Sequence, residues 1–248
     1  MSNKPLYLCI ESFQNEFVRE IHNSHIFLSQ ALPILNEAKD GHGESLHKKN
    51  RKYYVPSRKK GKFAERTDHE LKMIYDSFID HTLYEVMLIR MVSSFETFLG
   101  AVLEKVFIEY PNKLTIKVKD VDPVKTVPLE YLFDSKSVSD ILKKTIEQHL
   151  FGLFHAPAKA YLEYIEKVMK VDSSDPVFKE YFEVKATRDL LVHNSRTVND
   201  AYLEKAGKLA REKKGKKILV DESYFNYCVV KFKRASFIIK RDCKKTFG

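Results

Sequence analysis

The stretch R-D-L-L-V-H-N, residues 188–194, places an arginine, an aspartate and a histidine within one and a half helical turns. The imidazole of His193 has an ordinary pKa of about 6.5, so it can accept or donate a proton near neutral pH. Asp189 precedes it by four residues and shares its helical face, where a carboxylate can orient the imidazole and raise its pKa. Arg188 lies about 140° from His193 around the helix, so only its long side chain could bring the guanidinium near the ring. We therefore expect a complete site to be shared between two helices or two subunits.

The spacing from arginine to histidine is weak on its own. With ten Arg and nine His in the chain, an Arg followed by four to six residues and a His is expected by chance about once. A second copy does occur, from Arg19 to His25. The residues around Arg188 must therefore decide whether the pair is functional.

The helix that carries Arg188 changes character along one face. Phe178, Tyr181 and Phe182 define an apolar sector at 100° per residue. From the next turn onward the same sector receives the polar side chains of Lys185, Arg188, Asp189 and His193. This change indicates either an exposed helix end or a polar site built at an interface. Asp175 is expected to cap the helix, with Pro176 at its first position.

The spacing of apolar residues predicts an all-α protein. Only 8 Gly and 8 Pro occur in 248 residues, and most apolar residues recur at helical rather than alternating intervals. A first amphipathic helix is predicted over about residues 6–38, kinked or interrupted at Pro33 and ended by the D-G-H-G turn signal. A capping box of Thr67 and Glu70 opens a second helix that runs to Tyr110, about 60 Å.

Such a long helix is expected to kink, near Ser93, Ser94 or Gly100. An irregular connection with three prolines follows over residues 111–130. Asp221 is predicted to cap the last helix of the chain. The other helices are predicted over residues 138–151, 157–171 and 200–209.

Residues 48–62, K-K-N-R-K-Y-Y-V-P-S-R-K-K-G-K, hold eight Lys or Arg around two tyrosines. Basic side chains neutralise phosphates and tyrosine faces can stack on unpaired bases, so this segment is the best electrostatic candidate for an RNA contact. The competing interpretation is a solvated, mobile loop. The residues expected to bind RNA here are Arg51, Lys52, Tyr53, Tyr54, Arg58, Lys59 and Lys60.

The chain as a whole is basic, with 43 Lys and Arg against 34 Asp and Glu, a formal net charge of +9 and a pI near 9.2. This balance favours a polyanionic partner. Cys9, Cys228 and Cys243 are far apart, which fits a reducing cytoplasm rather than a disulfide framework or paired metal ligands. The first residues do not form a secretory signal, and no uncharged apolar run approaches the roughly 18 residues that cross a bilayer. We expect a cytoplasmic protein without a membrane partner.

The run K-A-T-R-D-L-L-V-H-N-S-R-T-V-N-D-A-Y-L resembles the signature helix of the HEPN superfamily. In that family an arginine and a polar residue precede a hydrophobic pair, V-H-N, a short turn and an acidic-aromatic start to the next helix. The run M-L-I-R-M-V-S-S-F-E-T-F-L-G, with Glu96 inside an apolar stretch, is similar to the family's earlier helix. The run G-K-K-I-L-V-D-E-S-Y-F is similar to the ending of the V-H-N subfamilies, of the RiboL-PSP and MAE-like type.

The resemblance covers about residues 68–247 and implies a HEPN-like antiparallel helical bundle with a long kinked helix. It divides the chain into an N-terminal helical extension with a basic loop, residues 1–66, and a HEPN-like helical domain, residues 67–248. Many members are toxins or defence and stress effectors, which leaves room for a neutralising protein partner.

The resemblance also implies a metal-independent endoribonuclease that needs no cofactor and acts as a homodimer, with two motifs facing each other across the interface. His193 would exchange protons with the ribose 2′-hydroxyl or the leaving oxygen, and Arg188 would hold the scissile phosphate. Asp189 would orient His193 or the substrate. Asn194 completes the catalytic motif.

Other polar residues admit two interpretations. Lys185 could add to RNA binding or lie on a solvated face. Glu96 could support the site or pair with Arg90 or Lys185 for structural reasons. His149 and His155 are expected to be packing or surface residues rather than metal ligands. Two rival functions stay open: a catalytically inactive HEPN module that binds RNA, a nucleotide or a protein partner, and an unrelated helical protein with a fortuitous match.

Overall fold

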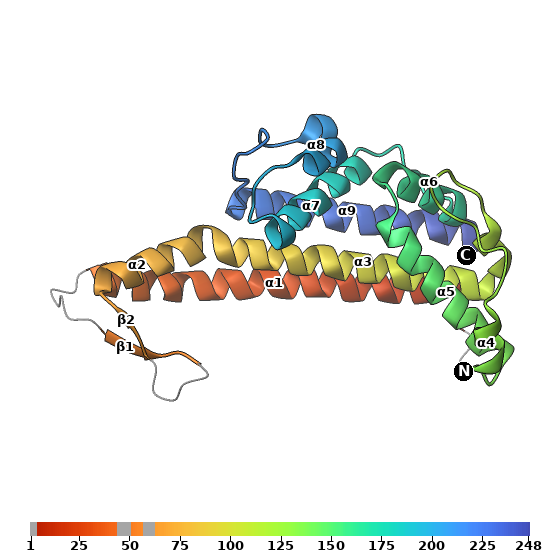
Figure 1. Cartoon of the computed structure of the whole chain (residues 1–248), viewed down its shortest axis with the longest axis horizontal. Coiled ribbons are helices and arrows are strands. Elements are labelled where there is room, and N and C mark those ends of the chain that lie inside the picture. Colours follow the sequence, from red (N-terminus) through yellow and green to blue (C-terminus); the bar gives the residue numbers. More distant parts are fainter. Residues whose placement is uncertain (1–3, 44–50, 57–62) are drawn as a thin grey trace.

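The computed structural model describes residues 4–43, 51–56 and 63–248. The chain is mostly helical, which confirms the predicted all-α class, and the described residues include one small β-hairpin. Two long helical runs lie side by side along the length of the molecule (Figure 1). One run is α1 (Leu6–Gly43), and the other consists of α2 (Asp68–Ser77), a π-turn η1 (Phe78–Thr82) and α3 (Leu83–Glu109).

Helix α1 is longer and less interrupted than predicted. It continues through Pro33 and on to Gly43, so the predicted interruption at Pro33 and the end near residue 38 are wrong. Its buried stripe packs against α2 and α3, because apolar residues recur along one face. This packing outweighs the backbone hydrogen bond that proline removes, since tertiary contacts supply most of a helix's stability.

The capping box predicted at the start of α2 is confirmed. Glu70 N–H donates to Thr67 Oγ1 at 3.2 Å, and Thr67 N–H donates to the Glu70 carboxylate at 2.7 Å. These hydrogen bonds hold the pKa of Glu70 below its ordinary value. Two backbone donors at the helix start are therefore satisfied, as the sequence indicated.

The break in the second long run lies earlier than predicted. It is the π-turn at Phe78–Thr82, whereas α3 is continuous through Ser93, Ser94 and Gly100, so the predicted kink there is wrong. Ser93 and the nearby Thr97 donate their hydroxyls to carbonyls one turn back, and Gly100 faces the ring of Phe154. These polar and small residues are thus accommodated without breaking the helix.

The run Asp68–Glu109 is long and apolar enough, by length and composition, to cross a membrane. Many of its apolar residues instead lie in the hydrophobic core, packed against α1 and the C-terminal helices, although Met73, Ile74, Phe78 and Val86 are exposed. Such packing is typical of the core helix of a soluble protein. A cytoplasmic location stays a prediction.

Residues 51–54 and 63–66 form an antiparallel hairpin, β1 (Arg51–Tyr54) and β2 (Phe63–Arg66), that the sequence reasoning missed. The hairpin lies at the end of the two long helical runs, between α1 and α2 in the chain (Figure 1). At its base Arg51 Nε lies 3.1 Å from Oδ1 of the buried Asp68. Residues 51–54 therefore form a strand rather than a loop, and all four are exposed, as the solvated interpretation expects. The predicted RNA-binding residues Arg58, Lys59 and Lys60 lie outside the described residues.

The second half of the chain follows the predicted order of helices. Asp221 Oδ1 accepts a hydrogen bond from Tyr224 N–H at 2.8 Å, which confirms the predicted cap of the last helix. A short 3-10 turn and a 5-residue helix lie in and just after the predicted irregular connection. The elements are η2 (Pro111–Thr115), α4 (Leu129–Phe133), α5 (Val138–His155), α6 (Ala158–Met169), α7 (Val177–His193), α8 (Asp200–Ala206), η3 (Gly207–Leu209) and α9 (Glu222–Phe247).

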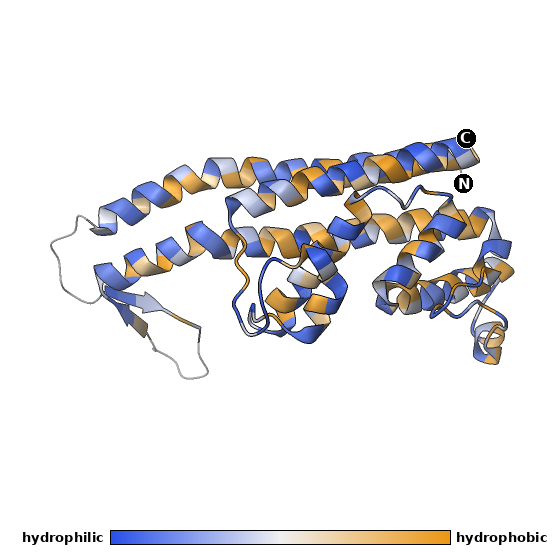
Figure 2. Cartoon of the chain, turned by 90° about the horizontal axis from the view of Figure 1, so that it is seen from above, coloured by the Kyte–Doolittle hydropathy of each residue, from blue (hydrophilic) through white to orange (hydrophobic). Residues whose placement is uncertain are grey.

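One hydrophobic core joins α1 to α3, α6, α7 and α9. Hydrophobic and hydrophilic residues alternate along the long helices, as in amphipathic helices that share a core (Figure 2). The division expected at residue 66 therefore does not separate two cores. A smaller cluster fills the space between α7 and α8, and its residues are Ala186, Leu190, Val198, Tyr202, Ala206 and Ile218.

Candidate active site

Helix α7 carries the predicted motif, and its start is fixed by the predicted cap. Val177 N–H donates to Asp175 Oδ1 at 3.0 Å, and Asp175 Oδ2 lies 2.7 Å from Arg234 Nη2. The backbone hydrogen bond and the guanidinium keep the pKa of Asp175 below its ordinary value. Helical geometry begins at Val177, one residue later than predicted.

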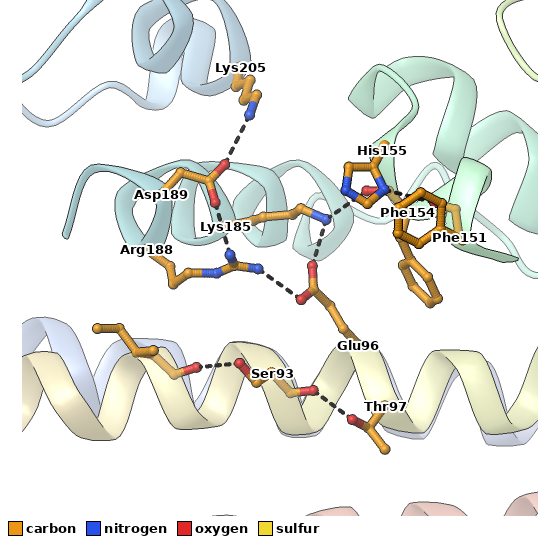
Figure 3. A network of polar contacts seen from close by, with 11 residues as sticks. Ser93, Glu96, Thr97, Phe151, Phe154, His155, Lys185, Arg188, Asp189 and Lys205 are labelled. Atoms are coloured by element: carbon orange, nitrogen blue, oxygen red, sulfur yellow. Dashed lines mark hydrogen bonds and ion pairs between the residues drawn. The ribbon is translucent and has the colours of Figure 1, made fainter. Parts of the chain in front are cut away.

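Glu96, in the middle of α3, holds two cations of α7 (Figure 3). Its Oε1 lies 2.6 Å from Lys185 Nζ, and its Oε2 lies 2.8 Å from Arg188 Nη2. All three side chains are only 19–20% exposed. The predicted pairing of Glu96 with Lys185 is therefore confirmed, and the solvated-face interpretation of Lys185 is wrong. Arg90, the other predicted partner, forms no ion pair with Glu96 in the described part of the chain.

Asp189 extends these contacts from α7 to α8 (Figure 3). Its Oδ1 lies 3.2 Å from Arg188 Nη1, and its Oδ2 lies 2.9 Å from Lys205 Nζ. Charges of opposite sign thus alternate along the contacts, which we call the Glu96 network, and the net charge is +1. The network consists of Lys185, Glu96, Arg188, Asp189 and Lys205.

The predicted orientation of His193 by Asp189 does not occur within one chain. Among the described residues no hydrogen bond or ion pair joins the two side chains. Both carboxylate oxygens of Asp189 face cations instead. Hydrogen bonds between oppositely charged groups are among the strongest in proteins, which accounts for the contacts of Asp189 with Arg188 and Lys205.

Arg188 is held in place and still has unused donors. Its guanidinium carries five N–H groups, and Glu96 and Asp189 contact the two terminal nitrogens. Its Nε is buried, without a hydrogen-bond partner among the residues described here. A phosphate can therefore reach the remaining terminal N–H groups, or displace one of the carboxylates, to form a bidentate contact.

His193 ends α7 and is exposed. It forms no hydrogen bond or ion pair with any other residue in the described ranges. The preceding residue, Val192, is 49% exposed, so an apolar side chain also reaches the surface at this end of α7. An exposed, unpaired imidazole is accessible to a molecule that approaches from outside, including a second copy of the chain.

The turn after His193 is strained and tightly anchored. Ser195 and Arg196 have φ angles of 47° and 69°, in the left-handed region that residues with a Cβ seldom adopt. Each such residue costs about 1 to 3 kcal/mol unless its surroundings enforce it. Arg196 Nη2 lies 2.9 Å from Oε2 of the buried Glu85 in α3, and Thr197 forms an antiparallel bridge with Lys217.

Asn194 uses its side chain inside this turn. Its Nδ2 donates to the carbonyl of Thr197, and its N–H donates to the Leu190 carbonyl at 3.0 Å. The structure thus gives Asn194 a turn-forming role. Its direct part in catalysis stays a prediction.

Sequence reasoning missed a buried carboxylate that organises the region. Glu183 is 4% exposed, and both of its oxygens accept hydrogen bonds. Burial raises the pKa of Tyr202 to about 12, so its hydroxyl stays protonated and donates. The donors are Thr187 Oγ1 at 2.8 Å, Tyr202 OH at 2.9 Å, Arg211 Nε at 3.2 Å and Tyr224 OH at 2.6 Å.

These hydrogen bonds tie α8 and the following loop to α7. They therefore also place Lys205, which lies on α8 and reaches Asp189. The only signal in the sequence is an acidic residue directly beside the apolar Phe178–Phe182 sector. Glu85 was missed in the same way: its only signal is that it is an acidic residue within the apolar pattern of α3. Its partner Arg196 is 111 residues away in the chain.

The predicted RNA-binding residues divide into two places. Lys185 belongs to the Glu96 network, whereas Arg51, Lys52, Tyr53 and Tyr54 form β1. The hairpin precedes α2, and Glu96 follows Asp68 by 28 residues of helical chain, about 42 Å at 1.5 Å per residue. One chain therefore does not bring its hairpin and its motif into one site.

The two histidines of α5 are packing and surface residues, as predicted. His149 is buried and its Nε2 lies 2.6 Å from Tyr164 OH, and burial lowers the pKa of His149. His155 is exposed, with Nδ1 at 2.8 Å from the Phe151 carbonyl. In the described residues no group of three or more His, Cys, Asp or Glu is arranged to hold a metal ion.

A scan of protein-family models, a search of curated proteins and a search of solved structures each found no match to this chain.

Proposed function

We propose that the chain is a HEPN endoribonuclease that cleaves RNA by attack of a ribose 2′-hydroxyl, as a homodimer and without a metal ion. The observation that carries the proposal is the arrangement in the C-terminal half of α7: Arg188 is held in place by two carboxylates, and His193 is exposed without a hydrogen bond or ion pair to any described residue. The resemblance of residues 185–203 to the HEPN signature supports the same assignment. A role as a toxin or a defence or stress effector, with a neutralising protein partner, belongs to this proposal.

The chemistry needs one base, one acid and one anion-stabilising group. His193 takes the proton of the 2′-hydroxyl, whose oxygen then attacks the adjacent phosphorus. Arg188 binds the phosphate oxygens and stabilises the charge that develops on them. The bond to the 5′-oxygen breaks and that oxygen takes a proton, which yields a 2′,3′-cyclic phosphate and a 5′-hydroxyl.

The need for a second proton-transfer group supports a dimer. Asp189 already contacts two cations, so its carboxylate is not free to serve as the second proton-transfer group. One chain then offers the imidazole of His193 as its proton-transfer group at this end of α7. A second copy brought against the exposed Val192 would supply its own His193 to the leaving oxygen. Base and acid would then come from the two subunits.

A catalytically inactive module that binds RNA, a nucleotide or a protein partner is the second candidate. Two observations favour it: both terminal nitrogens of Arg188 face carboxylates, and none of the described side chains orients His193. Such an arrangement would bind an anion without transferring protons.

The test compares an RNA oligonucleotide with the same sequence carrying 2′-O-methyl riboses, both in EDTA. The nuclease proposal expects cleavage of the first and none of the second, because methylation removes the attacking hydroxyl. Binding of both without cleavage of either would favour the inactive module.

A further inference from the structure

The positive charge of the chain is concentrated between α1 and α2. Residues 44–66 contain nine of the 43 Lys and Arg but only two of the 34 Asp and Glu, which is +7 of the net +9. The remaining 225 residues carry only +2. A polyanion is therefore attracted mainly to this segment, rather than to the nearly balanced Glu96 network.

The described part of this segment is the hairpin, and one of its faces is aromatic and exposed. Tyr54 and Phe63 are directly opposite in the strand register, so both side chains lie on the same face. Their ring centroids are 6.5 Å apart with planes at 75°, an edge-to-face pair. Tyr54 is 72% exposed and Phe63 is 55% exposed. The pair thus offers ring surface to a ligand instead of to the core.

A lysine flanks the aromatic pair. Lys52 precedes Tyr54 by two residues, so strand alternation places it on the same face. Its side chain is 67% exposed, and its Nζ lies 3.6 Å from Glu65 Oε1. An exposed ion pair of this kind contributes little, so Lys52 can exchange it for a phosphate at small cost.

The hairpin has a fixed base. Arg51, on the opposite face from Lys52, lies 3.1 Å from Oδ1 of Asp68, whose side chain is 6% exposed at the start of α2. This ion pair connects the first residue of β1 to the long helical run. The hairpin consequently lies at the end of the molecule (Figure 1), and the rings of Tyr54 and Phe63 are exposed there.

We propose that the face formed by Tyr54, Phe63 and Lys52 binds single-stranded RNA. Bases stack on the exposed rings, and Lys52 contacts a phosphate. Stacking requires unpaired bases, because a duplex keeps its base faces covered by neighbouring pairs. This inference rests on the proposed function and deepens it, since it names unpaired RNA as the substrate class and gives the hairpin the task of capturing it.

The test is binding of a fluorescent 20-nucleotide oligouridine, and of an RNA duplex of the same length, to the full-length His193→Ala protein. The His193→Ala change serves to prevent cleavage during the measurement. Adding Tyr54→Ala and Phe63→Ala together is expected to weaken binding of the single strand about 5- to 100-fold, the loss of stacking on one or two bases. Binding of the single strand should be tighter than binding of the duplex.

Two controls separate stacking from general effects. Tyr54→Phe keeps the ring and should therefore lose less affinity for the single strand than Tyr54→Ala. Phe133→Ala removes an aromatic side chain of α4 that is 83% exposed, and it should also leave binding unchanged. Circular dichroism checks that the double variant keeps its helical content.

Equal affinity of the double variant and the His193→Ala protein for oligouridine would overturn the inference. Tighter binding of the duplex than of the single strand would also overturn it. Failure to bind either RNA would overturn it as well, and would favour a protein partner for the aromatic face. The proposed nuclease fails on a different result, namely RNA cleavage that the His193→Ala protein still performs. Loss of stacking and loss of catalysis are thus measured on separate variants.

Discussion

Glu96 Oε2 and Arg188 Nη2 lie 2.8 Å apart, and this ion pair joins the middle of α3 to the C-terminal half of α7. Both side chains are about one-fifth exposed, so water screens the pair less than it would at an open surface. The guanidinium that we propose to bind phosphate is therefore oriented before RNA arrives. Its charge is partly neutralised until then.

Replacing Glu96 by glutamine should change both the affinity for RNA and the stability of the protein. The change removes the counter-charge of Lys185 and Arg188, so affinity for RNA should rise roughly 3- to 10-fold at low salt. The free energy of unfolding should fall by about 1 to 3 kcal/mol, because two part-buried cations lose a charged partner. RNA binding by anisotropy and thermal unfolding measure the two changes, with Glu104→Gln, an exposed residue of α3, as the control. RNA binding by Glu96→Gln equal to that of the wild type would argue against a phosphate contact at Arg188.

Replacing Glu183 by glutamine should destabilise the protein more strongly. The carboxylate accepts four hydrogen bonds in a buried position, and an amide presents one acceptor and one donor group to the same partners. We expect a loss of about 2 to 4 kcal/mol in the free energy of unfolding. Urea unfolding measures it against Glu204→Gln, an exposed residue of α8 that should change stability by less than about 0.5 kcal/mol. Equal stability of the two variants would show that the hydrogen bonds of Glu183 contribute little.

The strained turn after the motif offers a substitution that should stabilise. Ser195 has a φ of 47° and is exposed, so Ser195→Gly relieves the left-handed backbone without removing buried contacts. The relief is partly offset by the larger backbone entropy of glycine in the unfolded chain, and a net gain of about 0.5 kcal/mol is expected. Ser195→Val should lose about 1 kcal/mol or more. If the glycine variant unfolds at a lower temperature than the valine variant, the turn does not have this backbone conformation.

The buried His149 should make stability depend on pH. Burial lowers the pKa of His149, so the unfolded chain takes up a proton at a higher pH than the folded chain does. The contribution of neutral His149 to stability is complete well above the ordinary value of 6.5 and is lost as the pH falls below it. His149→Gln can keep a hydrogen bond to Tyr164 and cannot titrate. Urea unfolding between about pH 8 and pH 5 should therefore give a flatter profile for this variant than for the exposed-site control His155→Gln. Parallel profiles would mean that His149 is accessible to protons in the folded state.

Local signals in the sequence predicted most of the helical framework. The capping residues Thr67, Asp175 and Asp221 make the hydrogen bonds that their positions indicated, because a cap depends on residues within one turn. Helix order in the C-terminal half was predicted for the same reason. The failures at Pro33 and at the π-turn came from packing against a neighbouring helix, which local propensity does not contain.

The candidate site was predicted only in part. The resemblance of the surrounding run to a known signature helix, rather than the spacing alone, indicated Arg188, Asp189 and His193. The partners of Asp189 were Arg188 and Lys205 rather than His193. Pairs that lie far apart in the chain, such as Arg196 with Glu85, depend on the tertiary fold. Their spacing in the sequence therefore does not predict the contact. The hairpin was missed because its strands are short and lie within a segment rich in Lys and Arg, a composition that resembles a solvated loop.

The most direct test of the proposed function is the rate of RNA cleavage in EDTA by three purified proteins, with the 3′ ends of the products mapped. The proteins are the wild type, His193→Ala and His25→Ala. His25 is the matched control, because it is also exposed and follows Arg19 with the same type of spacing. We predict that the wild type and His25→Ala form 2′,3′-cyclic phosphate ends at similar rates, whereas His193→Ala is at least about 100-fold slower. Equal rates for His193→Ala and the wild type, or no cleavage by any of the three, would contradict the proposal that His193 is the catalytic residue of a ribonuclease.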